Sequence, residues 1–415
     1  MRIWIFNHYA HPPDLPGGTR HYDLGQELVK RGYQVTIFAS SFHHYLHRET
    51  RLQPRERWKI EDVNGVKFVW LRTPPYWRND WRRVRNMVAF ALRAWWLGRK
   101  LPKLAPDVRK PDVVIGSSPH LLTPLAAYLV AKHHRARCVM EVRDLWPQTI
   151  VDMGELSEHH PITRALQTLE RFLYRRAGRI IILGPQMEEY IAACSIGREK
   201  IVWIPNGIDL STFDRLSGES SAESPDCSGF VILYLGAHSE SNALDVVIRA
   251  ADIVRAKGYG NITFVLIGDG PTKENLIQLA ESLKLRNVRF QSPIPKTRVP
   301  KVLGKADVLL LTKHPTFRSY SGSILKLFDY MAAAKPIIYS AKTAYDPVET
   351  AGCGFVVNPG DPQALADAVI KLYQIPKEER EAMGRRGRQY VEKHHSIPLL
   401  AKRLEQVLKE VVESL

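Results

Sequence analysis

The sequence predicts two Rossmann-like domains, each a doubly wound parallel sheet with helices on both faces. Short β-branched runs alternate with amphipathic segments along all 415 residues, a length that is large for a single core. The runs fall into two groups, separated by the small, polar and acidic stretch "SGESSAESPDCSG" (217–229). We therefore expect an N-terminal domain over 1–215, a C-terminal domain over 228–395, and a last helix over 396–415 that can pack across both.

Each expected strand is a short apolar run bounded by turn residues. In chain order the first group is "RIWIF", "QVTIFAS", "KFVWLR", "DVVIGS", "CVMEV", "RIIIL" and "IVWIP". The second group is "FVILYLG", "ITFVLIG", "VRFQS", "DVLLLT", "PIIYS" and "GFVVN". Helical stretches such as "GTRHYDLGQELVKRG" and "LDVVIRAADIVRAKG" lie between them. In such folds ligands bind beyond the carboxyl ends of the strands, so the turns that follow strands are where a site is expected.

Composition narrows the class of protein. The chain is 45% hydrophobic and 25% charged, as in an ordinary globular protein, and 59 Lys and Arg against 43 Asp and Glu give a net charge of +16. That excess indicates an anionic partner: nucleic acid, a phosphorylated substrate or an acidic membrane. The four scattered cysteines argue against a disulfide framework or a zinc site, and they fit a reducing cytoplasm. No apolar run approaches the ~18 residues of a membrane span, and "MRIWIFNHYAHPP" predicts a buried strand rather than a signal peptide.

The stretch "SGSILKLFDYMAAAKPII" (321–338) predicts a helix that begins on small polar residues and ends at Pro336. Its free backbone N–H groups would favour an anion, and Lys326 and Asp329 share one face. Two interpretations stay open for the stretch alone. It is either a site for a nucleotide diphosphate with Asp329 on the ribose, or a capped amphipathic helix with a surface ion pair.

Two turns after strands of the second domain are further candidates. "YLGAHSESNALD" carries Gly236 and His238, and "LIGDGP" carries Gly268 and Gly270, where the absence of a side chain lets a ligand approach the backbone. In the first domain, "DLPGGTRHYDL" puts Gly17, Gly18 and Thr19 before a helix. "SSPHLLTP" and "EVRDLWPQT" follow strands and bring His120 and the group Glu141, Arg143 and Asp144 to one edge.

Taken together and in this order, "GGTRHYDLGQEL", "SSPHLLTPLAAYL", "EVRDLWPQT", "PNGID", "GAHSESNALD", "GDGP" and "KLFDYMAAAKP" resemble the family 4 retaining glycosyltransferases. The similarity covers roughly Arg2 to Tyr390 and is greatest to the bacterial O-antigen and capsule branch that includes the L-fucosamine transferases. The resemblance implies the GT-B architecture, in which two Rossmann-like domains face a central cleft.

The resemblance also implies roles for matching positions. Asp329 would hold the donor ribose, and the base would lie near Ile294. The remaining donor-binding positions would be Gly236, His238, Gly268, Gly270, Arg318, Ser321, Gly322, Ser323 and Lys326. The acceptor-binding positions would be Gly17, Gly18, Thr19, His120 and Arg143.

The chain departs from the family pattern at the catalytic centre. Ser321 stands where relatives have the first glutamate of Glu-x7-Glu, and Asp329 replaces the second. The turn that often carries an Arg and a Lys here has His238 and Asn242. We therefore expect Arg318 and Lys326 to stabilise the leaving diphosphate, and Asp144 to orient or deprotonate the acceptor. No Asp-x-Asp occurs in a plausible metal-binding loop, so we expect neither a metal nor another cofactor.

The segment "YWRNDWRRVRNMVAFALRAWWLGRKLPK" (76–103) has eight basic residues against Asp80. Trp81, Val84 and Val88 begin an apolar stripe at helical spacing. A membrane interface, a core-packed helix with a basic rim and nucleic-acid binding are the three interpretations. The interface reading involves Trp77, Trp81, Arg82, Arg85, Trp95 and Trp96.

The sequence thus predicts a retaining, metal-independent transferase that moves a sugar, an N-acetylated hexosamine or deoxyhexosamine, from a UDP-sugar to a polyprenyl-diphosphate-linked glycan. It would work in O-antigen or capsule synthesis, peripherally on the cytoplasmic face of the inner membrane and without nucleic acid. The alternatives are a GT-B-type nucleotide-sugar epimerase and a basic nucleic-acid-binding protein.

Overall fold

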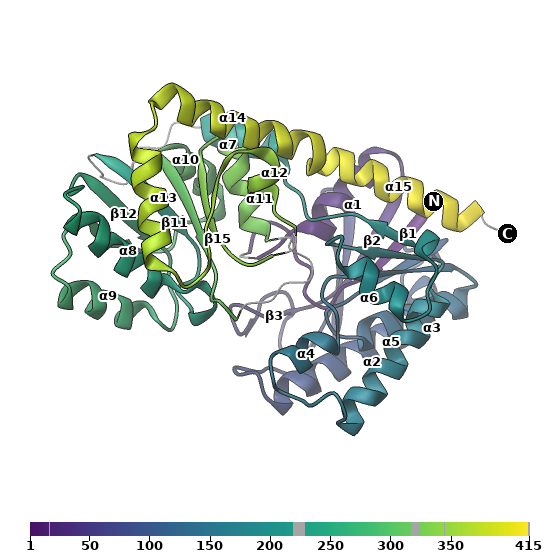
Figure 1. The fold of residues 1–415 in the computed structure, drawn as a ribbon. Helices are drawn as coiled ribbons and strands as arrows, with labels where there is room; N and C mark the ends of the chain where they lie inside the picture. The colour runs from purple at the N-terminus through teal and green to yellow at the C-terminus, as the bar shows by residue number, and fades with distance from the viewer. Residues whose placement is uncertain (16, 219–228, 317–323, 344, 414–415) are drawn as a thin grey trace. The chain divides into compact units, whose positions relative to one another are not determined.

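The structure, a computed structural model, describes residues 1–15, 17–218, 229–316, 324–343 and 345–413, which fold into two compact units (Figure 1). The first unit runs to Asn206 and takes up the chain again from Ile397, and the second covers Gly207–Ser396. The division lies earlier than the sequence predicts because Ile208 and Phe213 already pack in the core of the second unit. Both chain ends therefore belong to the first unit.

Within the described residues the first unit has an eight-stranded sheet of order β10-β9-β8-β7-β1-β2-β6-β5. Its strands are β1 (Arg2–Phe6), β2 (Gln34–Ser40), β5 (Trp58–Val63), β6 (Val66–Leu71), β7 (Val113–Ser117), β8 (Arg137–Val142), β9 (Arg179–Ile182) and β10 (Ile201–Trp203). A separate ribbon pairs β3 (Phe42–His43) with β4 (Arg48–Glu49). In the eight-stranded sheet all neighbouring strands are parallel except β5 and β6.

The antiparallel edge strand β5 corrects the expectation of purely parallel sheets. Asn64 and Gly65 both have positive φ (53° and 85°) and turn β5 into β6 within two residues. Asn-Gly between two such runs is the residue pair that favours a tight hairpin, because both positions must adopt φ > 0.

Both faces of this sheet are covered, because alternate residues of a strand point to opposite faces. Ile3 and Ile5 belong to one hydrophobic cluster, and Trp4 and Phe6 to another. The helices of the unit are α1 (Arg20–Lys30), α2 (Trp81–Leu104), α3 (Leu122–His134), α4 (Gln148–Asp152), α5 (Pro161–Arg176), α6 (Met187–Ala193), the short 3₁₀ turn η1 (Arg198–Lys200) and α15 (Ile397–Glu413).

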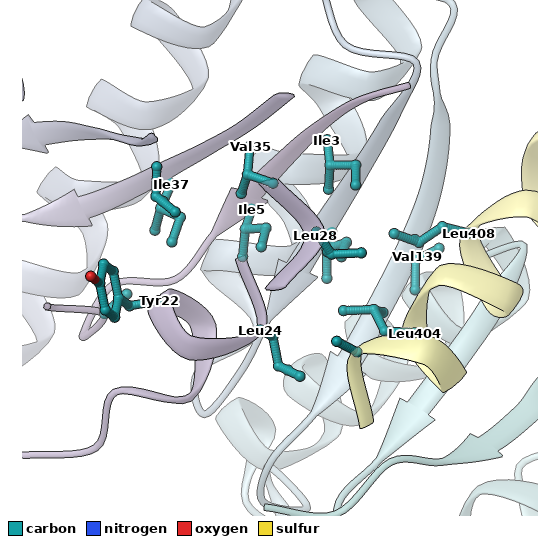
Figure 2. Close-up of a cluster of buried hydrophobic side chains, with 14 of the residues drawn as sticks. Ile3, Ile5, Tyr22, Leu24, Leu28, Val35, Ile37, Val139, Leu404 and Leu408 are labelled. Carbon is teal, nitrogen blue, oxygen red and sulfur yellow. The ribbon is translucent and has the colours of Figure 1, made fainter. Parts of the chain in front are cut away.

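The last helix, α15, is part of the first unit's core. Leu404 and Leu408 reach the cluster that also contains Leu24 and Leu28 of α1 (Figure 2). Each is at most 3% exposed, and truncating a leucine buried to that degree costs about 2–5 kcal/mol. The 190 residues of the second unit therefore lie between two parts of the chain that fold as one body.

The described part of the second unit contains a six-stranded parallel sheet of order β13-β12-β11-β14-β15-β16. Its strands are β11 (Phe230–Leu235), β12 (Ile262–Ile267), β13 (Val288–Gln291), β14 (Val308–Thr312), β15 (Ile337–Ser340) and β16 (Gly354–Val356). The helices are α7 (Leu210–Gly218), η2 (Glu240–Asn242), α8 (Leu244–Ala256), α9 (Lys273–Ser282), η3 (Lys296–Arg298), α10 (Val299–Gly304), α11 (Leu325–Ala332), α12 (Pro347–Ala351), α13 (Pro362–Gln374) and α14 (Lys377–His394). Every strand that the sequence predicts for either unit is present in the structure. Each unit is a doubly wound α/β fold. None of the described helices has the length and apolar character needed to cross a bilayer.

Candidate active site

Three neighbouring strands of the second unit, β12, β11 and β14, end at one edge of the sheet, and glycine turns follow two of them. Gly236 and Gly268 have φ of 153° and 150°. A Cβ on Gly268 would lie 1.9 Å from the Gly236 carbonyl oxygen, and one on Gly270 would lie 2.3 Å from the carbonyl oxygen of His238. The two turns pack backbone against backbone, so only glycine fits at these positions.

Lys326, on α11, reaches this edge. Its Nζ donates to Tyr234 Oη at 3.2 Å and lies 4.7 Å from the centre of the Tyr234 ring. A Cβ on Gly236 would lie 2.2 Å from that Nζ, so the glycine leaves the ammonium its space. Burial lowers the pKa of Lys326 to about 7, and the charge of Lys313 contributes to the shift. Burial disfavours the charged form of this lysine, and an anion that binds beside it would favour the charged form again.

Lys313, which follows β14, is a second cation here. Its Nζ donates to Asn242 Oδ1 at 2.8 Å, and the Thr312 hydroxyl donates to the Asn242 carbonyl at 2.6 Å. Burial lowers its pKa to about 8. Lys313 was not among the predicted site residues, because nothing in the sequence around it distinguishes it from an exposed surface lysine.

His238 lies in the turn after β11 and is 0% exposed. Both of its ring nitrogens are buried without a hydrogen-bond partner among the described residues. Burial lowers its pKa, followed by the charge of Lys273, so the ring is neutral at pH 7. In a neutral imidazole one ring nitrogen donates a hydrogen bond and the other accepts one, so His238 could bind either kind of group on a ligand.

The other predicted donor residues divide into two groups. Asp329 is half-buried on α11, where its charge raises the pKa of the buried Lys326, and Ile294 is half-buried against the core. Arg318, Ser321, Gly322 and Ser323 lie outside the described residues. Helix α11 begins at Leu325 after an extended Ile324 that makes no side-chain cap, so the helix starts later than the sequence predicts.

In the first unit, Glu141 is the next-to-last residue of β8 and lies inside a buried network, so it does not form one cluster with Arg143 and Asp144. Its carboxylate accepts from Arg20 Nε at 2.9 Å, from Ser117 Oγ at 2.6 Å and binds His21 Nε2 at 2.6 Å. Burial raises the pKa of Glu141, but the charges of His21 and Arg20 outweigh it and hold the pKa well below its usual range. The guanidinium of Arg20 also donates to the carbonyls of Ile204 and Pro205. The network thus joins α1 to the ends of β7 and β8 and to the segment that follows β10.

The predicted acceptor residues are spread around that network. Gly17 has φ of 131°, and a Cβ there would lie 2.3 Å from His11 Nε2, while Gly18 is half-buried beside it. Thr19 Oγ1 donates to Asp23 at 2.6 Å at the start of α1. Arg143 is half-buried, its backbone N–H donates to Ser118 Oγ at 2.8 Å, and Asp144 is exposed next to it.

His120 is the most enclosed of these residues, with 2% exposure. Its Nε2 lies 2.8 Å from His8 Nδ1 and 3.2 Å from Thr123 Oγ1. His8 and Tyr9 were not among the residues predicted to form the site. Polar residues directly after a buried strand were the available signal, because they face the edge where ligands bind.

Helix α2 and Trp77, which precedes it, present an apolar stripe to the outside of the first unit. Trp77, Trp81, Val84, Val88, Leu92 and Trp96 are between 39% and 62% exposed. The buried face of α2 is a different set that includes Met87, Phe90, Ala94 and Leu97. The predicted stripe from Trp81 to Val88 is therefore not core. Arginine and lysine side chains lie over the rings: Arg82 and Arg85 over Trp81, Arg99 over Trp95, and Lys100 over Trp96, each at 4.5–5.3 Å from a ring centre.

Comparisons with known proteins show which family the chain resembles. Residues 17–207 match the family model described as "Glycosyl transferase 4-like domain", and residues 221–390 match "Glycosyl transferases group 1". WcaI of Escherichia coli, a glycosyl transferase assigned to colanic acid biosynthesis, is 23% identical over 412 residues, which cover 95% of this chain and 96% of the relative. CapM of Staphylococcus aureus, a capsular polysaccharide biosynthesis glycosyltransferase, is 25% identical over 308 residues, 71% of this chain and 76% of the relative.

Solved structures share the fold along its whole length. Sucrose-phosphate synthase from Thermosynechococcus elongatus has a TM-score of 0.73 at 16% identity and covers 99% of this chain and 98% of its own. Anabaena HepE, solved with UDP and glucose, has a TM-score of 0.66 at 13% identity, with 99% and 100% coverage. The solved structures show that the chain has the GT-B fold. Because the two family models together span most of the sequence, the chain is a family 4 glycosyltransferase.

Proposed function

We propose that this glycosyltransferase moves a sugar from a UDP-sugar to a polyprenyl-diphosphate-linked glycan during surface polysaccharide synthesis, with retention and without a metal. The sugar we propose is an N-acetylated hexosamine or deoxyhexosamine, as in the L-fucosamine transferases that the motifs resemble.

The observation that carries the donor half is the strand edge of the second unit with its glycine turns, called the donor recess below. Lys326 on α11 and Lys313 after β14 lie half-buried at this edge, and burial lowers the pKa of both. Two lysines with lowered pKa values at one strand edge fit a diphosphate, whose negative charge would restore both to the charged form. UDP is the nucleotide in the HepE structure, and a UDP-sugar analogue is bound in the trehalose-6-phosphate enzyme of Escherichia coli, whose TM-score is 0.71.

The reaction follows from where charge develops. As the bond between the anomeric carbon and the diphosphate oxygen breaks, its electron pair stays on the diphosphate, and Lys326 stabilises that charge. The acceptor hydroxyl attacks the same face of the sugar and forms the new glycosidic bond. Its proton passes to the leaving phosphate oxygen, so no protein nucleophile is needed.

The acceptor half is supported by helix α2. Its exposed tryptophans and valines, bordered by arginines, suit the headgroup region of an anionic bilayer, where a lipid-linked glycan would be presented. Relatives named for colanic acid and capsular polysaccharide synthesis favour the same class of acceptor.

A nucleotide panel tests the donor assignment. We expect UDP to raise the melting temperature of the full chain more than ADP, GDP or TDP does, and 2′-deoxy-UDP to bind more weakly than UDP. In Asp329→Ala the preference for the ribose hydroxyl should disappear, whereas the surface variant Asp252→Ala should keep it. An equal response of wild type and Asp329→Ala to UDP and its deoxy analogue would contradict the ribose role. Conversion of the UDP-sugar with no acceptor present would indicate an epimerase instead.

A further inference from the structure

The first unit contains a second cationic recess, built at the ends of β1 and β7 and the start of α2, that the donor chemistry does not use. Aromatic rings enclose it: Tyr9 stacks on His8 with centres 4.3 Å apart, and lies 5.2 Å from His44 and 6.3 Å from His120. The Tyr76 hydroxyl closes it through a 2.6 Å contact with His44 Nδ1.

Three polar atoms of this recess are buried with no hydrogen-bond partner among the described residues: Tyr9 Oη, Arg83 Nε and His120 Nδ1. His120 is 98% buried, so its open nitrogen is a costly arrangement unless a ligand completes it. Arg83 donates from Nη1 to Asn79 Oδ1 at 2.8 Å. Burial raises the pKa of Tyr9, and the charge of Arg83 and its contact with the Tyr9 hydroxyl act against that shift, so the guanidinium lies beside the hydroxyl. Open donors from three separate segments thus gather around Tyr9.

The charge of the recess is positive. The charges of Arg83 and Arg143 both act on the Tyr9 hydroxyl, so both guanidinium groups lie near it. In the described part of the chain neither forms an ion pair within salt-bridge distance, although the charge of Arg143 also acts on the neighbouring Asp144. Neither His120 nor His44 contributes a positive charge at neutral pH. Burial lowers the pKa of His120 to about 3 and that of His44 to about 4, with the charge of Arg83 lowering both further. A histidine with such a pKa is a poor base at pH 7, so the recess is suited to binding rather than to proton abstraction.

We propose that Arg83, Tyr9 and His120 form an oxyanion site, and that it holds the diphosphate of the lipid-linked acceptor. Arg83 would supply the charge, while the Tyr9 hydroxyl and a neutral His120 N–H would donate to phosphate oxygens. This assignment rests on the proposed function, because it presumes an acceptor that carries a diphosphate.

The position of Arg83 favours a lipid source for that phosphate. Arg83 lies within one helical turn of Trp81, Val84 and Arg85, which are exposed on the same helix. A diphosphate at the headgroup level of a bilayer would therefore meet Arg83 next to the stripe that we expect to touch the membrane.

The test uses the full chain, inorganic pyrophosphate as the probe, and no membrane. In wild type with saturating UDP, pyrophosphate should bind at a second site, measured by calorimetry. Arg83→Gln should raise its dissociation constant at least tenfold, and Tyr9→Phe, which keeps the ring, should raise it several-fold. Arg85→Gln removes an equal charge from the exposed face of α2 and should leave pyrophosphate binding unchanged.

Lys326→Met separates this proposal from the donor assignment. If pyrophosphate binding is sensitive to Lys326 and not to Arg83, the anion occupies the donor recess and the proposal is overturned, as it is if wild type binds no pyrophosphate beside UDP. Failure of UDP to bind, with pyrophosphate binding still dependent on Arg83, would contradict the proposed donor alone. With a lipid-linked acceptor from a membrane extract, Arg83→Gln should raise the acceptor KM at least tenfold and leave the UDP-sugar KM unchanged. An unchanged acceptor KM would show that the site serves free phosphate and would overturn the lipid assignment.

Discussion

Replacing Lys326 with methionine should stabilise the ligand-free protein and weaken UDP binding, two effects of opposite sign from one substitution. Methionine is close to lysine in length and carries no charge, so it fills the space that Gly236 leaves open. The Tyr234 hydroxyl keeps a partner, because it also donates to the Ala237 carbonyl at 2.9 Å.

The size of both effects follows from the position of the ammonium. Its pKa falls from 10.5 to about 7, which at ~1.4 kcal/mol per unit means that holding the charged form there costs up to about 5 kcal/mol. Relaxation of the half-buried side chain reduces that cost, so we expect a gain of about 1–3 kcal/mol, or roughly 2–10 °C in Tm for a unit of this size. Loss of a charge-assisted hydrogen bond to the diphosphate costs about 1.5–3 kcal/mol, so the Kd for UDP should rise about tenfold to a hundredfold.

Differential scanning calorimetry and isothermal titration calorimetry measure the two quantities on the same preparation. Lys305→Met, at an exposed lysine of the same unit, is the matched control and should change neither by more than about 0.5 kcal/mol. A Lys326→Met protein that is more stable and binds UDP as tightly as wild type would refute the assignment of Lys326 to the diphosphate. A less stable protein would refute the account of Lys326 as a cation held at a cost.

Three further predictions test other parts of the structure. Because UDP binding requires Lys326 in its charged form and its pKa is about 7, the Kd for UDP should be flat below that pH and rise up to about tenfold per unit above it; a Kd that stays constant from pH 6 to 9 would contradict this. The double variant Arg82→Gln/Arg85→Gln should lower binding to anionic vesicles about thirtyfold, at ~1 kcal/mol per arginine, while Arg164→Gln, exposed on α5, should bind as wild type does in co-sedimentation. Glu141→Gln should cost about 3–5 kcal/mol in urea unfolding at pH 7, because it leaves Arg20 buried without its carboxylate. Since the folded pKa of Glu141 is lowered, its contribution is present above about pH 4 and is lost as the pH falls, so the acid limb of the stability curve should be shallower in the variant.

The strands could be predicted from sequence because each is a β-branched run buried on both faces, and tertiary packing agrees with local propensity there. Strand β5 was missed because its alternating pattern, "WKIEDV", is half polar and less apolar than the central strands. The Asn64–Gly65 turn was the better signal, since it specifies a hairpin through its backbone conformation rather than through hydrophobicity.

Candidate site residues could be proposed from the sequence where a motif lies in one continuous stretch, as for Lys326, Gly268 and Gly270. It was missed where the chemistry depends on pairs far apart in the chain. Lys313 is positioned by Asn242, 71 residues away, and His8 meets His120 across 112 residues. Such pairs are set by strand order, and a sequence without its sheet topology does not show that β1 and β7 are neighbours.

The partner of Glu141 is another contact that could not be predicted from the sequence. In the sequence it stands beside Arg143 and Asp144 and predicts one charged cluster. In the structure β8 ends at Val142, before Arg143 and Asp144, so Glu141 in the strand turns inward to Arg20 while Asp144 in the following bend is exposed.

The most direct test of the account is sugar transfer itself. Purified wild-type protein is incubated with isotopically labelled UDP-sugars and a lipid-linked acceptor extract in the presence of EDTA, and the labelled glycolipid is isolated and its anomeric configuration read by NMR. We predict transfer from a UDP-sugar with the donor's configuration retained, EDTA without effect, and a rate at least tenfold lower for Lys326→Met. An inverted product, a requirement for a divalent metal, or transfer that does not respond to the loss of Lys326 would contradict the account.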